Sequence, residues 1–370
     1  MRVALNLLYL IPGVVGGTET YARSLIQALA RRDDDNEYDV FVSREAAGLD
    51  VTPGPNFRRI VCPVVAMQRA WRYTWEQGAL PIQLLRQRPA LVHSLGYVSP
   101  LAARCPQVVS VHDLNYLGHK GRRTAFGRRA FQFFVERSVK RAKSVITISE
   151  FSRGEIIRNL RVPPEKVKVV YLAGRQADGD ASGPRADREI VLSVTRPYIL
   201  AFSSLSAHKN IRRLIAAFAK IASTVPHSLV LVGHLPEKTG VRQDIEAAGG
   251  DRVHFTGYLP DDDVDALMRD ASLFAFPSLY EGFGLPIIDA QHAGVPVACS
   301  SAGALPEVAG DGALTFDPLS VEDMANALQR GLVDMDLRAG IVAKGYENAR
   351  RFSWDRTARE TLAVYQSVVS

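Results

Sequence analysis

Cysteine is scarce in this chain of 370 residues, since only Cys62, Cys105 and Cys299 occur and they lie far apart. Their spacing matches neither a disulfide framework nor a zinc site, which favours a reduced, cytoplasmic setting. Long apolar runs are also missing, because no stretch reaches the roughly 18 apolar residues of a transmembrane helix. The apolar start, 1–17, has only Arg2 as a charged flank and no convincing cleavage site, so we expect a buried first strand rather than a signal peptide.

A strong charge of either sign is absent as well. The 45 basic and 39 acidic residues leave a net charge of +6, which fits ordinary surface variation, an anionic substrate or a membrane surface. No basic run interleaved with aromatic residues resembles a nucleic-acid platform, so we expect no nucleic-acid partner. Hydrophobic residues make up 47% of the chain and charged residues 23%, as in globular proteins, and the length suggests two domains.

Strand-like apolar runs alternate with helical periodicity, which predicts parallel sheets covered by helices. The predicted strands are 2–9, 38–43, 58–62, 91–94, 107–112, 144–148 and 167–171, then 197–202, 228–232, 253–255, 273–276, 296–299 and 312–316. Residues 174–196 are mostly polar, with glycines and a proline, and form the predicted linker. We therefore expect an α/β protein with two Rossmann-like domains, 1–173 and 197–352, whose sheets face each other across a cleft.

Residues 277–296, PSLYEGFGLPIIDAQHAGVP, carry the clearest chemical signal. Pro286 suits the first turn of a helix, where a missing N–H group costs nothing. The N–H groups of Phe283, Gly284 and Leu285 are then expected to point out of the helix start, where the helix dipole favours an anion. The segment therefore predicts a cradle for phosphate.

Three charged residues complete this pattern. Glu281 comes just before the glycine loop, and Asp289 lies one helical turn beyond Leu285, so hydroxyl groups can bind to acids on either side of the phosphates. Lys209 follows a strand and turn, where a point charge suits a diphosphate leaving group without a metal. The alternative is that Lys209 and His208 are solvated residues at a helix start.

Four segments occur in a fixed order along the chain. They are Gly16-Gly17-Thr18-Glu19, Ser203-Ser204-Leu205 through Lys209-Asn210, 277–297 with ALPEVAGDGAL, and FSWDRTARETLAVY. In this order they resemble the retaining, nucleotide-sugar-dependent glycosyltransferases of family 4, which have the GT-B fold. The resemblance covers most of the chain and implies that the last helix, 353–370, crosses back to the first domain.

The resemblance also implies roles for the residues of the second half. Glu281 would contact the hydroxyls of the donor sugar and Asp289 those of the ribose, although the family has glutamate at this second position. Ser204 and Lys209 would belong to the donor site, together with the loop amides already named. Leu259 would lie near the base. Many relatives carry an arginine a few residues before the lysine, and serines stand there in this chain.

In the first half the resemblance points to two places. Gly16 and Gly17 would let the backbone pass close to the β-phosphate or the acceptor. His112, at the end of the apolar run VVSVHD, would touch the donor sugar near the reacting carbon. The alternative for His112 is a core histidine held by Asp113.

Two acidic clusters invite a metal interpretation, 33–35 and 261–265. The second contains an Asp-x-Asp pair, which could bind a divalent ion. Because it follows Pro260 and precedes an apolar helix, we interpret it as an N-cap and acidic first turn. We expect neither a metal nor another cofactor.

Residues 119–143 concentrate cations around Phe126, Phe131, Phe133 and Phe134. One interpretation is the solvated face of a helix that packs on the core, and the other is a segment beside anionic lipid. The family resemblance implies a nucleotide-sugar donor and a glycan or lipid-linked acceptor as partners, and the second interpretation of 119–143 adds peripheral contact at the inner face of the membrane.

The predicted reaction is retaining transfer of a hexose from a nucleotide sugar to an acceptor hydroxyl. The residues of the KN-x-x-x-LI-x-AF and PSLYEGFGLP motifs resemble those of mannosyl- and rhamnosyltransferases of polysaccharide pathways, which favours GDP-mannose as donor. Two alternatives remain: a nucleotide-sugar 2-epimerase on the same fold, and a non-catalytic protein that binds a nucleotide or sugar.

Overall fold

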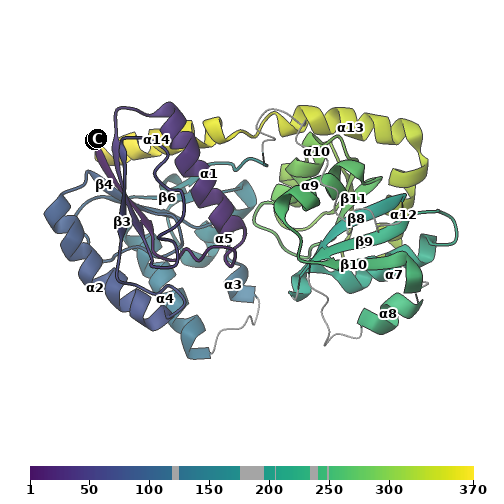
Figure 1. Cartoon of the computed structure of the whole chain (residues 1–370), viewed down its shortest axis with the longest axis horizontal. Helices are drawn as coiled ribbons and strands as arrows, with labels where there is room; N and C mark the ends of the chain where they lie inside the picture. The colour runs from purple at the N-terminus through teal and green to yellow at the C-terminus, as the bar shows by residue number, and fades with distance from the viewer. Residues whose placement is uncertain (119–124, 176–195, 205, 234–240, 248–249) are drawn as a thin grey trace. The chain divides into compact units, whose positions relative to one another are not determined.

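The computed structural model describes the chain except residues 119–124, 176–195, 205, 234–240 and 248–249 (Figure 1). The chain divides into two compact units. Unit 1 comprises Met1–Leu172 and Ser353–Ser370, and unit 2 comprises Ala173–Phe352. Most of the predicted linker lies outside the described residues.

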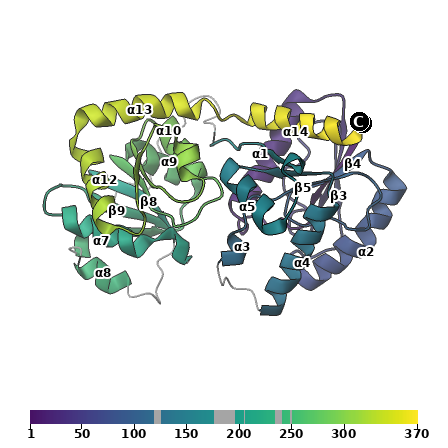
Figure 2. The ribbon, with the colours of Figure 1, turned by 180° about the vertical axis from the view of Figure 1, so that it is seen from behind.

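Unit 1 is built on a seven-stranded parallel sheet of order β3-β2-β1-β4-β5-β6-β7. The strands are β1 (Arg2–Leu7), β2 (Glu37–Val42), β3 (Phe57–Val61), β4 (Leu91–Ser94), β5 (Gln107–Ser110), β6 (Ser144–Thr147) and β7 (Val167–Val169). The helices are α1 (Gly17–Arg32), α2 (Arg69–Gln87), α3 (Asn115–Gly118), α4 (Ala125–Arg141), α5 (Glu150–Leu160) and α14 (Trp354–Val369), with the short η1 (Pro164–Lys166). The last helix, α14, lies against α1 (Figures 1 and 2).

The central strands of this sheet are buried because helices cover both faces. β1 is buried from Val3 to Leu7, and β4, β5 and β6 are buried along their whole length. Such strands read as continuous apolar runs rather than as alternating ones, which is why the sequence predicts them well.

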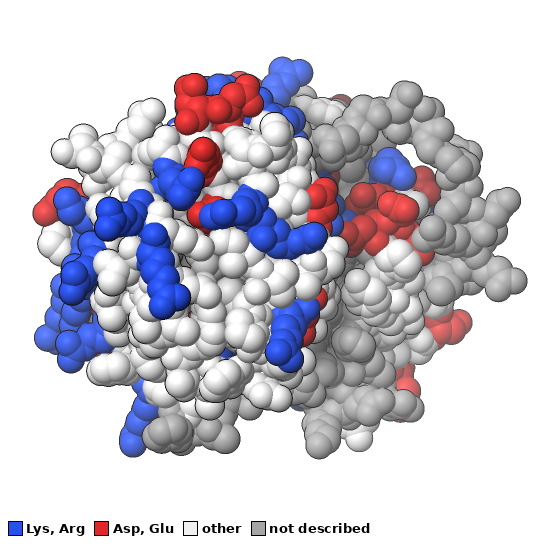
Figure 3. Space-filling model, turned by 60° about the vertical axis from the view of Figure 1, so that its left-hand side comes forward, with Lys and Arg blue, Asp and Glu red and all other residues white. Residues whose placement is uncertain are grey.

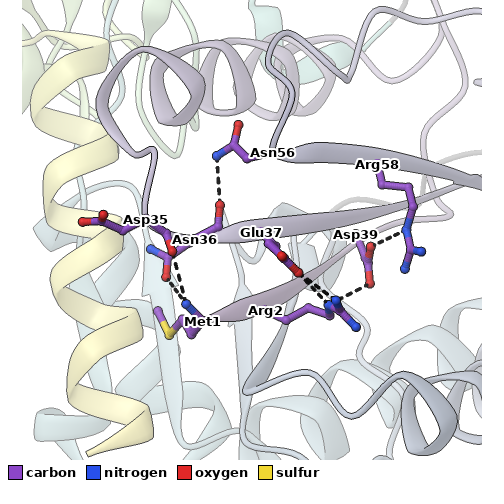
Figure 4. A network of polar contacts seen from close by, with 8 residues as sticks. All are labelled: Met1, Arg2, Asp35, Asn36, Glu37, Asp39, Asn56 and Arg58. Carbon is purple, nitrogen blue, oxygen red and sulfur yellow. Dashed lines mark hydrogen bonds and ion pairs between the residues drawn. The ribbon is translucent and has the colours of Figure 1, made fainter.

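Charged residues join the first strands of the sheet at their starts. Arg2 on β1 pairs with Glu37 on β2 at 2.7 Å, and Arg58 on β3 pairs with Asp39 at 2.8 Å (Figure 4). The terminal amino group donates to Asn36 Oδ1 at 2.9 Å. Water screens the exposed pair of Arg2 and Glu37, so this pair fixes the alignment of the strands more than it stabilises the fold, whereas the carboxylate of Asp39 is buried.

Unit 2 has a six-stranded parallel sheet of order β10-β9-β8-β11-β12-β13. The strands are β8 (Tyr198–Ser203), β9 (Ser228–Gly233), β10 (Val253–Gly257), β11 (Leu273–Phe276), β12 (Val297–Ser300) and β13 (Leu314–Phe316). The helices are α7 (Ile211–Ile221), α8 (Val241–Ala247), α9 (Asp261–Asp270), α10 (Leu285–His292), α11 (Leu305–Ala309), α12 (Val321–Val333) and α13 (Met335–Ala349), with η2 (Ala207–Lys209) and η3 (Gly250–Arg252).

Two apolar layers sandwich the second sheet. One contains Phe218 of α7 and Leu328 of α12, and the other contains Leu267 of α9 and Ile287 of α10. Both sheets are parallel, as the sequence predicts, and each predicted strand is present within a few residues of its expected bounds. Among the described residues, no helix combines the length and hydropathy that crossing a bilayer requires.

Candidate functional site

The glycine loop of unit 2 connects the buried strand β11 to α10. Gly284 caps the helix with φ 115°, and a Cβ atom there would lie 2.7 Å from Leu305 Cδ2, so this position requires glycine. Within the described parts of the chain, we find no hydrogen bond from the amides of Gly284 or Leu285. Pro286 stands in the first turn, as predicted. The helix start therefore presents donors that suit an anion.

An ion pair stands beside this loop. Lys209 Nζ lies 2.6 Å from Glu281 Oε1, and the two side chains are only 22% and 19% exposed. The same ammonium lies 5.0 Å from the ring centre of Phe276, at the end of β11. The structure thus brings together two residues that the sequence separates by 72 positions, and it places an ammonium and a carboxylate side by side next to the glycine loop.

Asn210 and Gly303 position this pair, and sequence reasoning gave neither a role. The buried Asn210 side chain donates to the carbonyls of Pro277 at 3.0 Å and Pro318 at 2.8 Å. Gly303 has φ +66°, and a Cβ atom there would come within 2.7 Å of the carbonyl oxygen of Glu281. The glycine of the sequence SAGALPE was a usable signal, whereas the contacts of Asn210 depend on residues remote in sequence.

Asp289 lies on the second turn of α10 and is already engaged. Its Oδ1 accepts a hydrogen bond from the backbone N–H of Arg175 at 2.7 Å. The Arg175 guanidinium lies 3.1 Å from Asp261 and 3.5 Å from Asp265. Burial raises the pKa of Asp289 to about 6, and the Arg175 amide and guanidinium oppose this shift. The role of Arg175 at this site is not evident from the sequence, because it stands at the edge of the predicted linker.

The other predicted donor residues of unit 2 have mixed surroundings. Ser204 follows β8 and its hydroxyl accepts from the Ser206 amide at 3.2 Å. The side chain of Leu259 is 3% exposed and packs in the core layer of α9, so its backbone is the part that remains for a ligand. Phe283 is equally buried, with its ring edge-on to Phe352 at 5.7 Å.

The candidate residues of unit 1 lie at the carboxyl ends of its strands. Gly16 caps α1 and Gly17 is its first residue. His112 follows β5, is 4% exposed, and lies edge-on to the Tyr21 ring at 4.6 Å. Burial lowers the pKa of His112 to about 4. Its Nε2 has no hydrogen-bond partner within the described residues, and Asp113 accepts instead from the Asn115 amide at 3.0 Å.

A buried chain of hydrogen bonds ends at Tyr21, a residue that contacts His112. His93 Nδ1 is 2.7 Å from the hydroxyl of Tyr365 on α14, and its Nε2 is 2.8 Å from Ser110 Oγ. Ser110 Oγ is also 2.8 Å from the hydroxyl of Tyr21. Burial lowers the pKa of His93 to about 3, so this histidine is neutral and serves the structure rather than a ligand.

The acidic cluster at 261–263 forms the first turn of α9, as interpreted from the sequence, with Pro260 rather than an aspartate at the N-cap. The segment 119–143 includes α4, whose Phe131 and Val135 pack into the core while Phe133 is 50% exposed under the guanidinium of Arg137. The residues 119–124 of that segment are outside the described part of the chain.

Comparison with known proteins places these features in a family. Residues 15–173 match the family model described as Glycosyltransferase Family 4, and residues 184–348 match Glycosyl transferases group 1. O-antigen chain mannosyltransferase B of Escherichia coli is 33% identical over 243 residues, which cover 63% of this chain and 62% of that protein. MMP alpha-(1->4)-mannosyltransferase of Mycolicibacterium hassiacum is 33% identical over 255 residues, with 65% and 59% covered. The match thus spans about three fifths of each relative's length.

A solved structure supports the same architecture. Sucrose-phosphate synthase from Thermosynechococcus elongatus superposes with a TM-score of 0.77 at 21% identity, over 99% of this chain and 98% of that one. The two parallel sheets and this likeness define a GT-B fold. The chain belongs to glycosyltransferase family 4, a family of retaining enzymes that use a nucleotide-sugar donor and an acceptor.

Proposed function

We propose that this enzyme moves a mannose-like hexose from a nucleotide sugar, GDP-mannose being favoured, to a hydroxyl of a glycan, lipid-linked or small-molecule acceptor. The observation that carries the assignment is the 2.6 Å pair of Lys209 and Glu281 beside the amides of Gly284 and Leu285, which have no acceptor among the residues that the structure describes. The two mannosyltransferases named above support mannose as the transferred sugar, since each is 33% identical to the chain over its matched stretch.

In this proposal the bond to the diphosphate breaks ahead of the bond to the acceptor. Negative charge then collects on the diphosphate, where Lys209 and the amides of Gly284 and Leu285 stabilise it. Glu281 holds sugar hydroxyls and Asp289 those of the ribose, which fixes the donor for reaction. No side chain is assigned as a covalent nucleophile, and the leaving phosphate accepts the proton of the incoming hydroxyl.

His112 is proposed to bind the donor sugar through Nε2, for which the described residues provide no hydrogen-bond partner. A buried polar atom without a partner is rare in folded proteins and calls for a ligand or water. Because burial keeps the pKa of His112 near 4, the ring is neutral at pH 7 and can form a hydrogen bond without adding a charge beside the reacting carbon.

The test is transfer from GDP-mannose by the purified enzyme and by two variants, Lys209→Ala and Glu281→Ala. Each is expected to lose about a hundredfold or more in kcat, as when one stabilising donor is removed from a transition state. The matched controls are Lys220→Ala and Glu322→Ala, which break an exposed ion pair of 2.7 Å in the same unit and leave transfer unchanged.

The outcomes separate the alternatives. Full turnover in both variants removes the assigned roles. Isomerisation of a nucleotide sugar without any acceptor favours the 2-epimerase, and binding without turnover for every acceptor favours a non-catalytic protein.

We further propose that unit 1 contacts an anionic lipid surface near a lipid-linked acceptor. The exposed apolar residues of α2 are Trp71, Ile82 and Leu85, each close to half exposed. The single acid of α2, Glu76, is buried, whereas Arg69 and Arg86 are exposed. Figure 3 shows basic side chains around an uncharged area on one face of the molecule. Apolar groups framed by cations suit a bilayer that carries negative charge.

A further inference from the structure

A groove with a volume of about 270 Å³ opens beside Asp289, entirely within unit 2. Its apolar lining includes Phe202, Val264 and Met268, and its charged lining includes Arg175, Asp265 and Arg269. Pockets for complete drug-sized ligands measure about 300–1,000 Å³. The groove therefore has room for one part of such a ligand, such as a ring system, with the rest of that ligand extending beyond Asp289.

The charged residues of the groove offer both kinds of hydrogen-bonding partner. The Asp265 carboxylate only accepts hydrogen bonds, and the guanidinium groups of Arg175 and Arg269 only donate them. Arg175 Nη1 lies 3.1 Å from Asp261 without hydrogen-bond geometry and has no hydrogen-bond partner among the described residues. Burial raises the pKa of Asp265, which indicates that its surroundings are partly shielded from water.

These partners match one nucleobase better than the others. Guanine presents two adjacent donors, N1–H and the N2 amine, which a carboxylate can accept together, and two acceptors, O6 and N7, for a guanidinium. Uracil and adenine each place an acceptor next to a donor on the corresponding edge. A carboxylate facing that edge leaves one of its oxygens opposed to a lone pair, which costs affinity.

We propose that this groove holds the base of the donor nucleotide and that Asp265 makes it selective for guanine. The proposal rests on the proposed function, in which Asp289 holds the ribose. The ribose at Asp289 places the base over the apolar walls from α9 and β8, and Arg175 covers it from the start of unit 2.

The experiment is isothermal titration of the full chain with GDP, UDP and inosine diphosphate, which is GDP without the N2 amine. The proteins are the wild type, Asp265→Asn and the matched control Asp262→Asn, an exposed aspartate in the first turn of α9. We expect the wild type to prefer GDP over UDP, and over inosine diphosphate, by about ten- to hundredfold, the worth of one bidentate base contact. Asp265→Asn should lose both preferences and keep its affinity for UDP, and Asp262→Asn should behave like the wild type.

Three results would overturn the inference, and each is distinct from failure of the proposed function. UDP binding as tightly as GDP in the wild type removes the guanine assignment while sugar-nucleotide transfer stands. Preferences that survive in Asp265→Asn, or that are lost equally in Asp262→Asn, show that this carboxylate does not read the base. If none of the diphosphates binds the wild type at all, the proposed function itself is wrong.

Discussion

The side-chain amide of Asn210 donates to the carbonyl of Pro277 at 3.0 Å, and it thereby joins the turn that carries Lys209 to the segment that carries Glu281. A second bond reaches the carbonyl of Pro318 at 2.8 Å. Asn210 has φ 57°, a conformation that asparagine tolerates better than most residues. One buried side chain thus fixes the relative position of the two charged groups.

Asn210→Ala should therefore weaken both the fold and the reaction. Each buried carbonyl that loses its donor costs about 1–3 kcal/mol in the free energy of unfolding, and kcat should fall because Lys209 moves away from Glu281. Urea unfolding and steady-state transfer measure the two effects. Asn326→Ala, on the exposed side of α12, should change stability by less than about 0.5 kcal/mol. Unchanged stability and kcat in Asn210→Ala would show that the two hydrogen bonds are dispensable.

Gly303→Ala tests the support of Glu281 from the other side. The added Cβ atom would lie 2.7 Å from the carbonyl oxygen and 2.9 Å from the nitrogen of Glu281, at a positive φ. We expect a loss of about 1–3 kcal/mol in the free energy of unfolding from backbone strain alone, together with a lower kcat. Gly340→Ala on α13 is the control, because nothing lies within 4 Å of its added Cβ atom and alanine is the better helix former. Equal behaviour of the two variants would contradict the close packing at Gly303.

Asp289 should make stability and donor binding depend on pH in opposite directions. Its pKa is about 6 in the folded chain and about 4 when unfolded, so between these values the native state keeps a proton that the unfolded chain has lost. The free energy of unfolding therefore falls as pH rises through this window, by up to about 1.4 kcal/mol per pH unit. The ionised form is the better acceptor for ribose hydroxyls, so affinity for GDP should rise over the same range.

Asp289→Asn is the matching variant, since it keeps the size of the side chain and removes its titration. Chemical unfolding and GDP titration at several pH values should show that both dependences flatten. If the variant and the wild type follow parallel curves, another group is responsible.

The strands and the glycine-loop motif around Glu281 could be predicted from the sequence, because buried parallel strands are continuous apolar runs and the motif is local. The ion pair between Glu281 and Lys209, 72 positions apart, could not, and neither could the contacts of Asn210, Gly303 and Arg175. They depend on partners up to 114 positions away, which no short pattern specifies. The sequence also left two interpretations of His112 open. Its burial next to Tyr21, and the bond of Asp113 to the Asn115 amide, support the proposed ligand role over a core histidine held by Asp113.

The buried histidines of unit 1 should destabilise the fold in acid. Burial lowers the pKa of His93 to about 3 and that of His112 to about 4. Below about pH 6.5 these histidines are therefore protonated in the unfolded chain while they stay neutral in the native state. The free energy of unfolding contributed by each is complete above pH 6.5 and falls with decreasing pH by about 1.4 kcal/mol per unit. His112→Gln should reduce this slope in urea unfolding between about pH 4.5 and 6.5. This range lies roughly between the pKa of His112 in the folded chain and its pKa in the unfolded chain. A slope equal to that of the wild type would contradict burial of a neutral His112.

The exposed face of α2 should bind vesicles that contain anionic lipid. Trp71 and Ile82 are 49% and 54% exposed, and a fully buried side chain of this kind contributes roughly 1.5–3 kcal/mol when it leaves water. The double variant Trp71→Ser, Ile82→Ser should therefore float with phosphatidylglycerol vesicles at least tenfold less than the wild type.

The control is Leu319→Ser, Met335→Ser in unit 2, where both side chains are more exposed than on α2 but are not part of this face. High salt should weaken the wild-type binding, because the arginines act through screened charge. Equal flotation with neutral phosphatidylcholine vesicles, or equal flotation of the two double variants, would contradict a lipid-binding role for α2.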